Sequence, residues 1–398
     1  RPFTTGFPRA DIHELISMDL LHQIVKGTFK DHVVDWIETY IRNNNEKAEA
    51  DRILADIDRR IAVTPPFPGL RHFHTGRGYK QWTGNDSKGL MKVYLPAIAG
   101  HVPPTVVQAV ADIIEFCHLV RRSVIDEDTL IAIDQSVSRF HLHREVFRAT
   151  VRPEGFSLPR QHSMVHYRPL IQMFGATNGL CSSITESKHI KAVKKPYRRT
   201  SHNKPLSQIL LTNQRLDKLA AARIDFTARG MMDGSLLPLP LFYAPSDVSG
   251  IGGMYHERIR ATKSWYRGPP RYDCIFMEDD KDLAGFRGLH AARVRVLFRF
   301  KYRGIDYPCA LIHWFSARGD HPCPDTGMWI VTPDSLRDGG PSLAVVHLDC
   351  FLRGAHLIGV AGRDFIPIRN FDFFDSLDAF KAFYVNKYAD HHAHEIAS

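Results

Sequence analysis

The chain has 398 residues, of which 44% are hydrophobic and 11% are aromatic, so it can bury a sizeable core and is not intrinsically disordered. Its 52 lysines and arginines outnumber its 43 aspartates and glutamates, and the formal charge of +9 favours polyanionic partners. No apolar run reaches the roughly 18 residues that cross a bilayer, and no charged and then apolar leader opens the sequence. We therefore expect a soluble intracellular protein of two or three structural units with no membrane partner.

Two further features bear on the class of protein. The six cysteines stand singly, with no C-x-x-C pair, which favours reduced and mostly buried thiols. Because the sequence opens at Arg1 without an initiator methionine, we expect a fragment or a processed chain.

The first two thirds of the chain are predicted to be helical, because apolar residues recur at helical spacing. The pattern begins between Phe29 and Ile41 and is interrupted by a proline-rich break near residue 65. Pro104 is suited to the first turn of a helix. Further helices are expected at residues 46–63, 87–100, 104–122, 126–147 and about 206–224, which together form an α-helical block over roughly residues 30–230.

The last third is predicted to be rich in strands. Residues 293–302, RVRVLFRFKY, alternate with period two, which predicts a half-buried strand with a basic outer face. A hairpin partner follows at 307–315, with further strands at 327–333 and 342–349, so we expect a small antiparallel and plausibly barrel-like β-domain. A closing helix capped by Ser376 should pack back on the sheet.

The first candidate site is Asp19, at the end of the apolar run in ISMDLLHQIVKG, with His22 following closely. An aspartate at the end of a buried strand can hold a divalent cation while the following loop leaves room for substrate. The structural alternative is an N-cap for a helix that starts near Leu20. The sequence leaves both open.

The second candidate site is the pair His162 and His166 in LPRQHSMVHYRPL. Four residues apart on a helix, both side chains could reach one zinc ion. A pair is only half a site, and Cys117 with His118 is the nearest plausible source of further ligands. The alternative is two structural or solvated histidines. No H-E-x-x-H arrangement is present, which argues against a zinc peptidase or nuclease.

The third candidate site is Glu186, at the head of a basic run. From Lys188 to Lys204 there are seven lysines and arginines and no acid. Positive neighbours favour an ionised carboxylate, which suits metal ligation. In metal-assisted phosphoryl transfer, carboxylates hold paired Mg²⁺ ions while lysine and arginine hold the phosphates. The alternative is an ordinary basic surface helix.

The tail DHHAHEI, from Asp390 on, is interpreted as a solvated helix end rather than a metal site.

Several long segments carry a resemblance to a known family. They are residues 18–37, 67–73, 79–100 with Tyr79 in place of a usual Phe, 152–167, 174–199, 210–231 and 375–397. These segments resemble the Plavaka transposases of fungal mobile elements, which belong to the CACTA-like group. The similarity runs over nearly the whole chain.

The resemblance implies a ribonuclease-H-like core with an Asp, Asp, Glu triad and two Mg²⁺ or Mn²⁺ ions. Asp19 would be the second acid and Glu186 the last, with a helical insertion between them. His162 and His166 are similar in placement to the zinc-binding histidines of related recombinases, with Cys117 a weaker candidate partner. The phosphate-holding surface next to Glu186 would be Lys188, Lys191, Lys194, Lys195, Arg198 and Arg199.

The sequence departs from the family pattern at the first catalytic Asp, which should lie well upstream of Asp19. Asp11 is too close to Asp19 to serve. We therefore expect the carboxyl-terminal portion of a cut-and-paste DNA transposase, acting on DNA in the nucleus, with strand cleavage by this chain alone not expected. The alternative is a catalytically dead relic or a domesticated DNA-binding protein. Self-association into a homo-oligomer is compatible with either interpretation.

The expected fold class is α+β: the back half of a ribonuclease-H-like core with a large all-α insertion, then a small antiparallel β-domain and a closing helix. The expected segments are the end of the core with the second acid (1–29), the helical insertion (30–160), the last core segment with Glu186 and the basic helix (161–232), a linker (233–270) and the β-rich domain (271–398).

Overall fold

The computed structural model describes residues 3–7, 11, 16–78, 82–177, 180–182, 188–229, 241–245, 256–265, 267–368 and 371–398. The chain forms two compact units: unit 1 comprises Arg1–Asn178 with Pro240–Ser398, and unit 2 comprises Gly179–Leu239. Among the described helices, none is both long and apolar enough to span a membrane.

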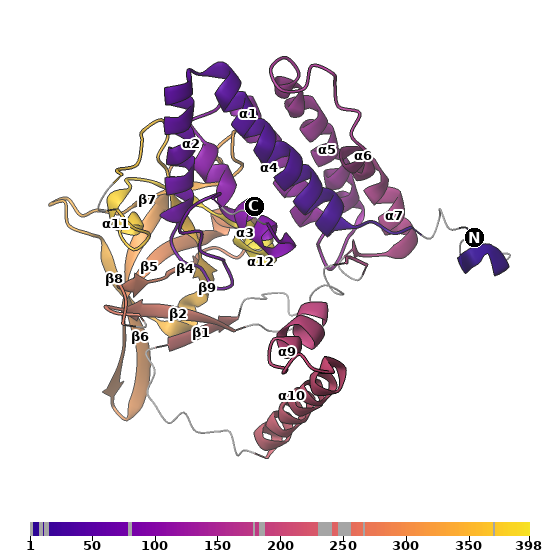
Figure 1. The fold of residues 1–398 in the computed structure, drawn as a ribbon. Helices are drawn as coiled ribbons and strands as arrows, with labels where there is room; N and C mark the ends of the chain where they lie inside the picture. The colour runs from indigo at the N-terminus through magenta and orange to yellow at the C-terminus, as the bar shows by residue number, and fades with distance from the viewer. Residues whose placement is uncertain are drawn as a thin grey trace. The chain divides into compact units, whose positions relative to one another are not determined.

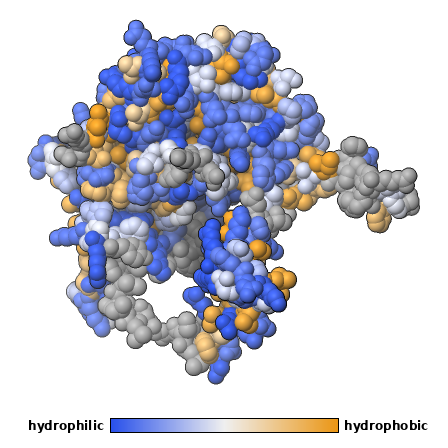
Figure 2. Space-filling view, viewed as in Figure 1, coloured by the Kyte–Doolittle hydropathy of each residue, from blue (hydrophilic) through white to orange (hydrophobic). Residues whose placement is uncertain are grey.

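Unit 1 begins with a layer of helices (Figure 1). They are the π-helical segment η2 (Leu20–Val34), α1 (Asp35–Asn44), α2 (Lys47–Ala62), α3 (Gly84–Ile98), α4 (Pro104–Leu119), α5 (Glu127–His143), α6 (Pro159–His162) and α7 (Tyr167–Phe174), with short 3-10 turns η1 (Phe3–Gly6), η3 (Arg144–Phe147) and η4 (Ser163–His166). The predicted helical block is confirmed in this region. The face of this layer shown in Figure 2 is mostly hydrophilic, and most of the apolar residues of these helices are buried.

The helix starts follow from local sequence. Pro104 occupies the first turn of α4, as predicted. The α5 helix begins after Asp126, whose Oδ1 accepts a hydrogen bond from the Thr129 backbone N–H at 2.8 Å. The α3 helix begins three residues before the expected start, because Thr83 and Asp86 form a reciprocal capping box.

The strands of unit 1 are all antiparallel. They are β1 (Leu241–Pro245), β2 (His256–Thr262), β3 (Arg271–Tyr272), β4 (Cys274–Glu278), β5 (Leu289–Tyr302), β6 (Ile305–Ala317), β7 (Ile330–Pro333), β8 (Leu343–His347), β9 (Phe351–Ala355), β10 (Leu357–Gly359) and β11 (Phe383–Val385). Strands β1, β2 and β3 form one sheet, and the larger sheet runs β10-β11-β7-β6-β5-β4-β9, with β8 paired to β6. The predicted α+β class and the antiparallel sheet are confirmed.

The larger sheet curls on itself. Its first and last strands, β10 and β9, are consecutive in the chain and separated only by His356. One extended segment therefore hydrogen-bonds to β4 through its first half and to β11 through its second half. An aromatic core fills one face, with Phe276, Phe315 and Phe383 at its centre. The sheet is therefore barrel-like, as predicted.

The hairpin of β5 and β6 corrects one expectation. Val294 is buried, but the side chains expected to be buried beyond it, from Val296 to Tyr302, are 37–55% exposed. Strand β4 pairs only with residues up to Arg293, and the ladder to β6 shifts register between Val294 and Val296. A β-bulge there lets the outer half of the hairpin leave the sheet.

The predicted long closing helix is wrong. Its segment divides into α11 (Ser376–Ala379), strand β11, the turn η9 (Lys387–Ala389) and α12 (His391–Ala397). Ser376 is the first residue of α11 and not its cap, since the N-cap position is Asp375. The aromatic and β-branched run Phe383–Val385 favours a strand, and it pairs between β10 and β7.

Buried polar contacts join the helices of unit 1 to its sheet region. Asp56 and Arg60 on α2 are buried and form an ion pair at 2.8 Å. Arg60 Nη2 donates to the carbonyl oxygens of Gly362 and Asp364, both at 2.9 Å, and Asp56 accepts from the Ile366 N–H. The helices and the sheet are thus one compact unit, while the functional segment boundaries expected from the sequence stay predictions.

The ribonuclease-H-like core also stays a prediction. Residues 16–19 are irregular, and in the part of the chain that the structure describes every strand lies at or after Leu241. Three glycines of the expected linker lie outside the described residues: Gly250, Gly252 and Gly253.

Unit 2 is small and helical. Its described elements are η6 (Ile190–Lys194), α9 (Lys195–Tyr197) and α10 (Pro205–Ala228). Asn213 Nδ2 on α10 donates to the Ala192 carbonyl at 2.8 Å, which fastens the basic segment to the long helix.

Candidate nucleic-acid interface

Asp19 is the N-cap of η2. Its Oδ1 accepts hydrogen bonds from the backbone N–H groups of Leu21 at 3.1 Å and His22 at 3.3 Å, and its Oδ2 lies 2.6 Å from His22 Nδ1. The capping alternative is therefore confirmed. The Asp19 side chain is about a third exposed (32%).

The residues present fit a hard divalent cation only in part. Asp19 supplies an accessible carboxylate, the ligand type that Mg²⁺ and Mn²⁺ prefer, and the His22 contact would orient it as an outer-shell partner does. Glu186 lies outside the described residues. Among the residues that are described, no three His, Cys, Asp or Glu side chains gather as a metal site. The role of both acids as metal ligands stays a prediction.

His162 and His166 do lie together. Their Nε2 atoms are 3.3 Å apart, at the end of α6 and the end of η4, and both side chains are exposed. This places two imidazoles where one ion could contact both, which is half of a zinc site.

Cys117 is not grouped with these histidines in the described part of the chain. It is buried on α4 at 2% exposure, and burial raises the pKa of its thiol to about 12. A zinc ligand must be a thiolate, so this cysteine is placed and protonated as a core residue. The zinc expected from the sequence stays a prediction.

The basic segment is exposed as a whole. Each of its predicted phosphate-holding side chains faces solvent: Lys188, Lys191, Lys194, Lys195, Arg198 and Arg199. Among the described residues none of these six is seen in an ion pair with an acid. Tyr197 stands among them, stacked on His202 with ring centroids 4.8 Å apart. Unpaired surface cations beside an exposed aromatic ring are typical of a nucleic-acid contact.

The net charge of the chain is concentrated in unit 2. Residues 188–229 hold eleven of the 52 lysines and arginines but only two of the 43 acids, Asp217 and Asp225. The remaining residues hold 41 of each kind and are neutral as a group. The charge of +9 is therefore a property of this segment and not of the whole surface, which strengthens the case for a localised polyanion contact.

A groove that sequence reasoning missed lies in unit 1. It has a volume of about 930 Å³ and is bounded by the loop at Phe67–His74, by β2 and the loop after it, and by the start of α12. Trp265 lines it, with the guanidinium carbons of Arg260 and Arg271 at 5.3 and 4.6 Å from its ring. The sequence signal was present, because five cations and no acid occur between Arg258 and Arg271.

The two acids of this groove are engaged inside the protein. Arg353 is fully buried and donates to Glu257 Oε1 at 2.5 Å and to Asp390 Oδ1 and Oδ2 at 2.9 and 2.6 Å. Burial raises the pKa of Glu257, although Arg353 opposes the shift. The acids thus organise the wall of the groove, and Arg353 offsets one of their two charges.

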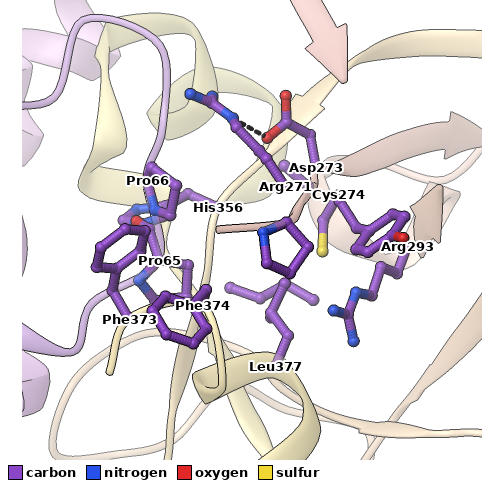
Figure 3. Close-up of a pocket in the computed structure, with 14 residues that line it drawn as sticks. Pro65, Pro66, Arg271, Asp273, Cys274, Arg293, His356, Phe373, Phe374 and Leu377 are labelled. Carbon is purple, nitrogen blue, oxygen red and sulfur yellow. Dashed lines mark hydrogen bonds and ion pairs between the residues drawn. The ribbon is translucent and has the colours of Figure 1, made fainter. Parts of the chain in front are cut away.

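A smaller cavity of about 30 Å³ lies against β3 and β4 (Figure 3). Arg271 Nε donates to Asp273 Oδ1 at 2.7 Å on one side, while Phe373 and Leu377 form an apolar side. Burial raises the pKa of the Cys274 thiol to about 12. The volume has room for little more than a water molecule, so this cavity is not a substrate site.

The histidine-rich tail from Asp390 on packs against α4, so the interpretation of this tail as a solvated helix end was wrong. His394 is 1% exposed, its Nε2 lies 2.9 Å from Glu115 Oε1 on α4, and its ring stacks on His118 with centroids 4.9 Å apart. Burial would raise the pKa of Glu115, but the bond to His394 and the nearby Lys387 hold it well below its ordinary value.

Comparison with known proteins gives one finding. Residues 1–37 match a family model described as Plavaka transposase. The matched stretch contains Asp19, all of η2 and the first turn of α1. No curated protein and no solved structure matches the chain.

Proposed function

Because residues 1–37 match the Plavaka transposase family, we propose that the chain is the carboxyl-terminal portion of a DDE-type cut-and-paste DNA transposase that works in the nucleus. Asp19 and Glu186 would hold Mg²⁺ or Mn²⁺, and the cations from Lys188 to Arg199 would hold the DNA backbone. The bound ions would stabilise charge at the phosphodiester being cleaved or transferred.

The observation that carries this proposal is the family match, because it includes the aspartate that the resemblance assigns to the metal site. The concentrated charge of residues 188–229 supports it independently. Phosphate contacts by lysine and arginine position a protein on DNA without reading its sequence. Six exposed cations that have no acidic partner in the described part of the chain can make such contacts.

The second candidate function is DNA binding without cleavage, as in a relic or a domesticated protein. One observation favours it: the contacts of Asp19 with Leu21 and His22 are those of a helix cap. The two candidates share the DNA contact and differ in the metal.

Removing charge from the basic segment tests the shared claim. In the variant Lys194→Gln, Lys195→Gln, Arg198→Gln, Arg199→Gln, the log–log slope of duplex affinity against salt should shrink by about four, since each phosphate contact contributes roughly one. Fluorescence anisotropy at several salt concentrations measures it.

The matched control removes the same charge from exposed residues of unit 1: Lys47→Gln, Lys281→Gln, Arg318→Gln, Arg337→Gln. The control should keep the slope of the unaltered chain. If the two variants lose slope equally, the duplex is attracted by net charge alone and the assigned interface is wrong.

A further inference from the structure

The groove beside β2 differs in chemistry from the basic segment of unit 2. Its wall combines a large aromatic side chain, Trp265, with three arginines that line the same space, Arg258, Arg260 and Arg271. A volume of about 930 Å³ lies within the usual size of a ligand site, about 300–1,000 Å³. A groove of this size admits a single nucleotide and is too small for a duplex, whose two grooves alone are about 8.5 and 7.5 Å deep.

One atom of the wall is left unsatisfied. Arg271 is 7% exposed, and its Nε is taken by Asp273, but its Nη2 is buried with no hydrogen-bond partner among the described residues. A buried guanidinium N–H without an acceptor is costly, and an anionic oxygen bound in the groove would satisfy it.

The loop that carries Trp265 adds more positive charge. Lys263 and Arg267 are exposed on it, and Arg267 has a left-handed backbone with φ of 61°, a conformation that non-glycine residues seldom adopt. The half-buried Phe373 also lines the groove and offers further aromatic surface. Aromatic rings and arginine planes together bind unpaired bases by stacking, while neighbouring cations hold the backbone.

We propose that this groove binds an unpaired nucleotide segment of DNA, with a base stacked on Trp265 and the adjoining phosphate held by Arg258, Arg260 and Arg271. This rests on the proposed function in that DNA is the partner, but it assigns a different surface and a different form of DNA from the basic segment. The duplex binds at unit 2, and the single strand binds at the groove.

The test compares a short labelled single strand with the same strand annealed to its complement, using the full chain and fluorescence anisotropy. Stacking on one aromatic side chain is worth about 1–3 kcal/mol per base, so Trp265→Ala should weaken single-strand binding by about tenfold and leave duplex affinity unchanged. Trp265→Phe keeps an aromatic face and should keep most of the single-strand affinity.

Trp314→Ala is the matched control, because Trp314 is also half-buried but packs against the core residues Val294 and Ile312 of the larger sheet. It should leave single-strand binding unchanged. The groove assignment is overturned if Trp265→Ala binds the single strand as tightly as the unaltered chain, if Trp314→Ala weakens it equally, or if polyglutamate competes as well as the single strand does. Duplex binding that persists in any of these cases leaves the proposed function standing, whereas loss of all DNA binding by the unaltered chain removes both.

Discussion

The affinity of this chain for duplex DNA should fall by about a thousandfold when salt rises from about 50 to about 200 mM. Six cations released from counterions by phosphate contacts give a log–log slope near −5, at about −0.9 per contact. The six are the exposed residues from Lys188 to Arg199, and their lack of acidic partners among the described residues means that no internal ion pair has to break first.

Anisotropy titrations across that salt range measure the slope, with pH and temperature fixed. A fall of less than about tenfold would mean that fewer than two phosphates are contacted. Such a result would contradict the backbone-holding role of the segment after Glu186.

Replacement of Arg353 by methionine should lower the free energy of unfolding by about 3–5 kcal/mol, because breaking a buried ion pair leaves an uncompensated charge. Arg353 is fully buried and binds Glu257 and Asp390 together. Methionine keeps much of the volume, so the loss reports the two stranded carboxylates rather than a cavity. Urea unfolding measures the change, provided that the dependence of the unfolding free energy on urea concentration is the same in both proteins.

Two variants make this result specific. Arg337→Met changes an exposed arginine and should shift stability by less than about 0.5 kcal/mol. Adding Glu257→Gln to Arg353→Met should recover part of the loss, because one of the stranded charges is then removed. A loss below about 1 kcal/mol for Arg353→Met alone would show that the three side chains do not depend on one another.

The helices of unit 1 could be predicted because their signals are local. Pro104 and Asp126 mark the starts of α4 and α5, and the apolar periodicity between them does not depend on distant residues. The same holds for the cap at Asp19, which a sequence motif predicts as readily as a metal site.

The predictions that the structure overturned concern contacts between segments that are distant in the sequence. The alternation of β5 predicts a strand, but whether its outer half is covered depends on how far β4 extends alongside it. The tail was taken as solvated because its partner Glu115 lies 279 residues away in sequence from His394. The groove around Trp265 is assembled from four separate segments, and only its basic loop can be recognised from the sequence.

The transposase interpretation is tested most directly by Mn²⁺ binding to the full chain in the presence of DNA, with Asp19→Asn, Glu186→Gln and Asp11→Asn as variants. Asparagine caps a helix as well as aspartate does, so Asp19→Asn keeps the start of η2 while it removes the charge and one of the two carboxylate oxygens. If the two acids hold the metal, Asp19→Asn and Glu186→Gln each lose tight Mn²⁺ binding while Asp11→Asn matches the unaltered chain. If all three variants bind Mn²⁺ as the unaltered chain does, Asp19 is a helix cap and nothing more, and the protein binds DNA without the assigned catalytic acids.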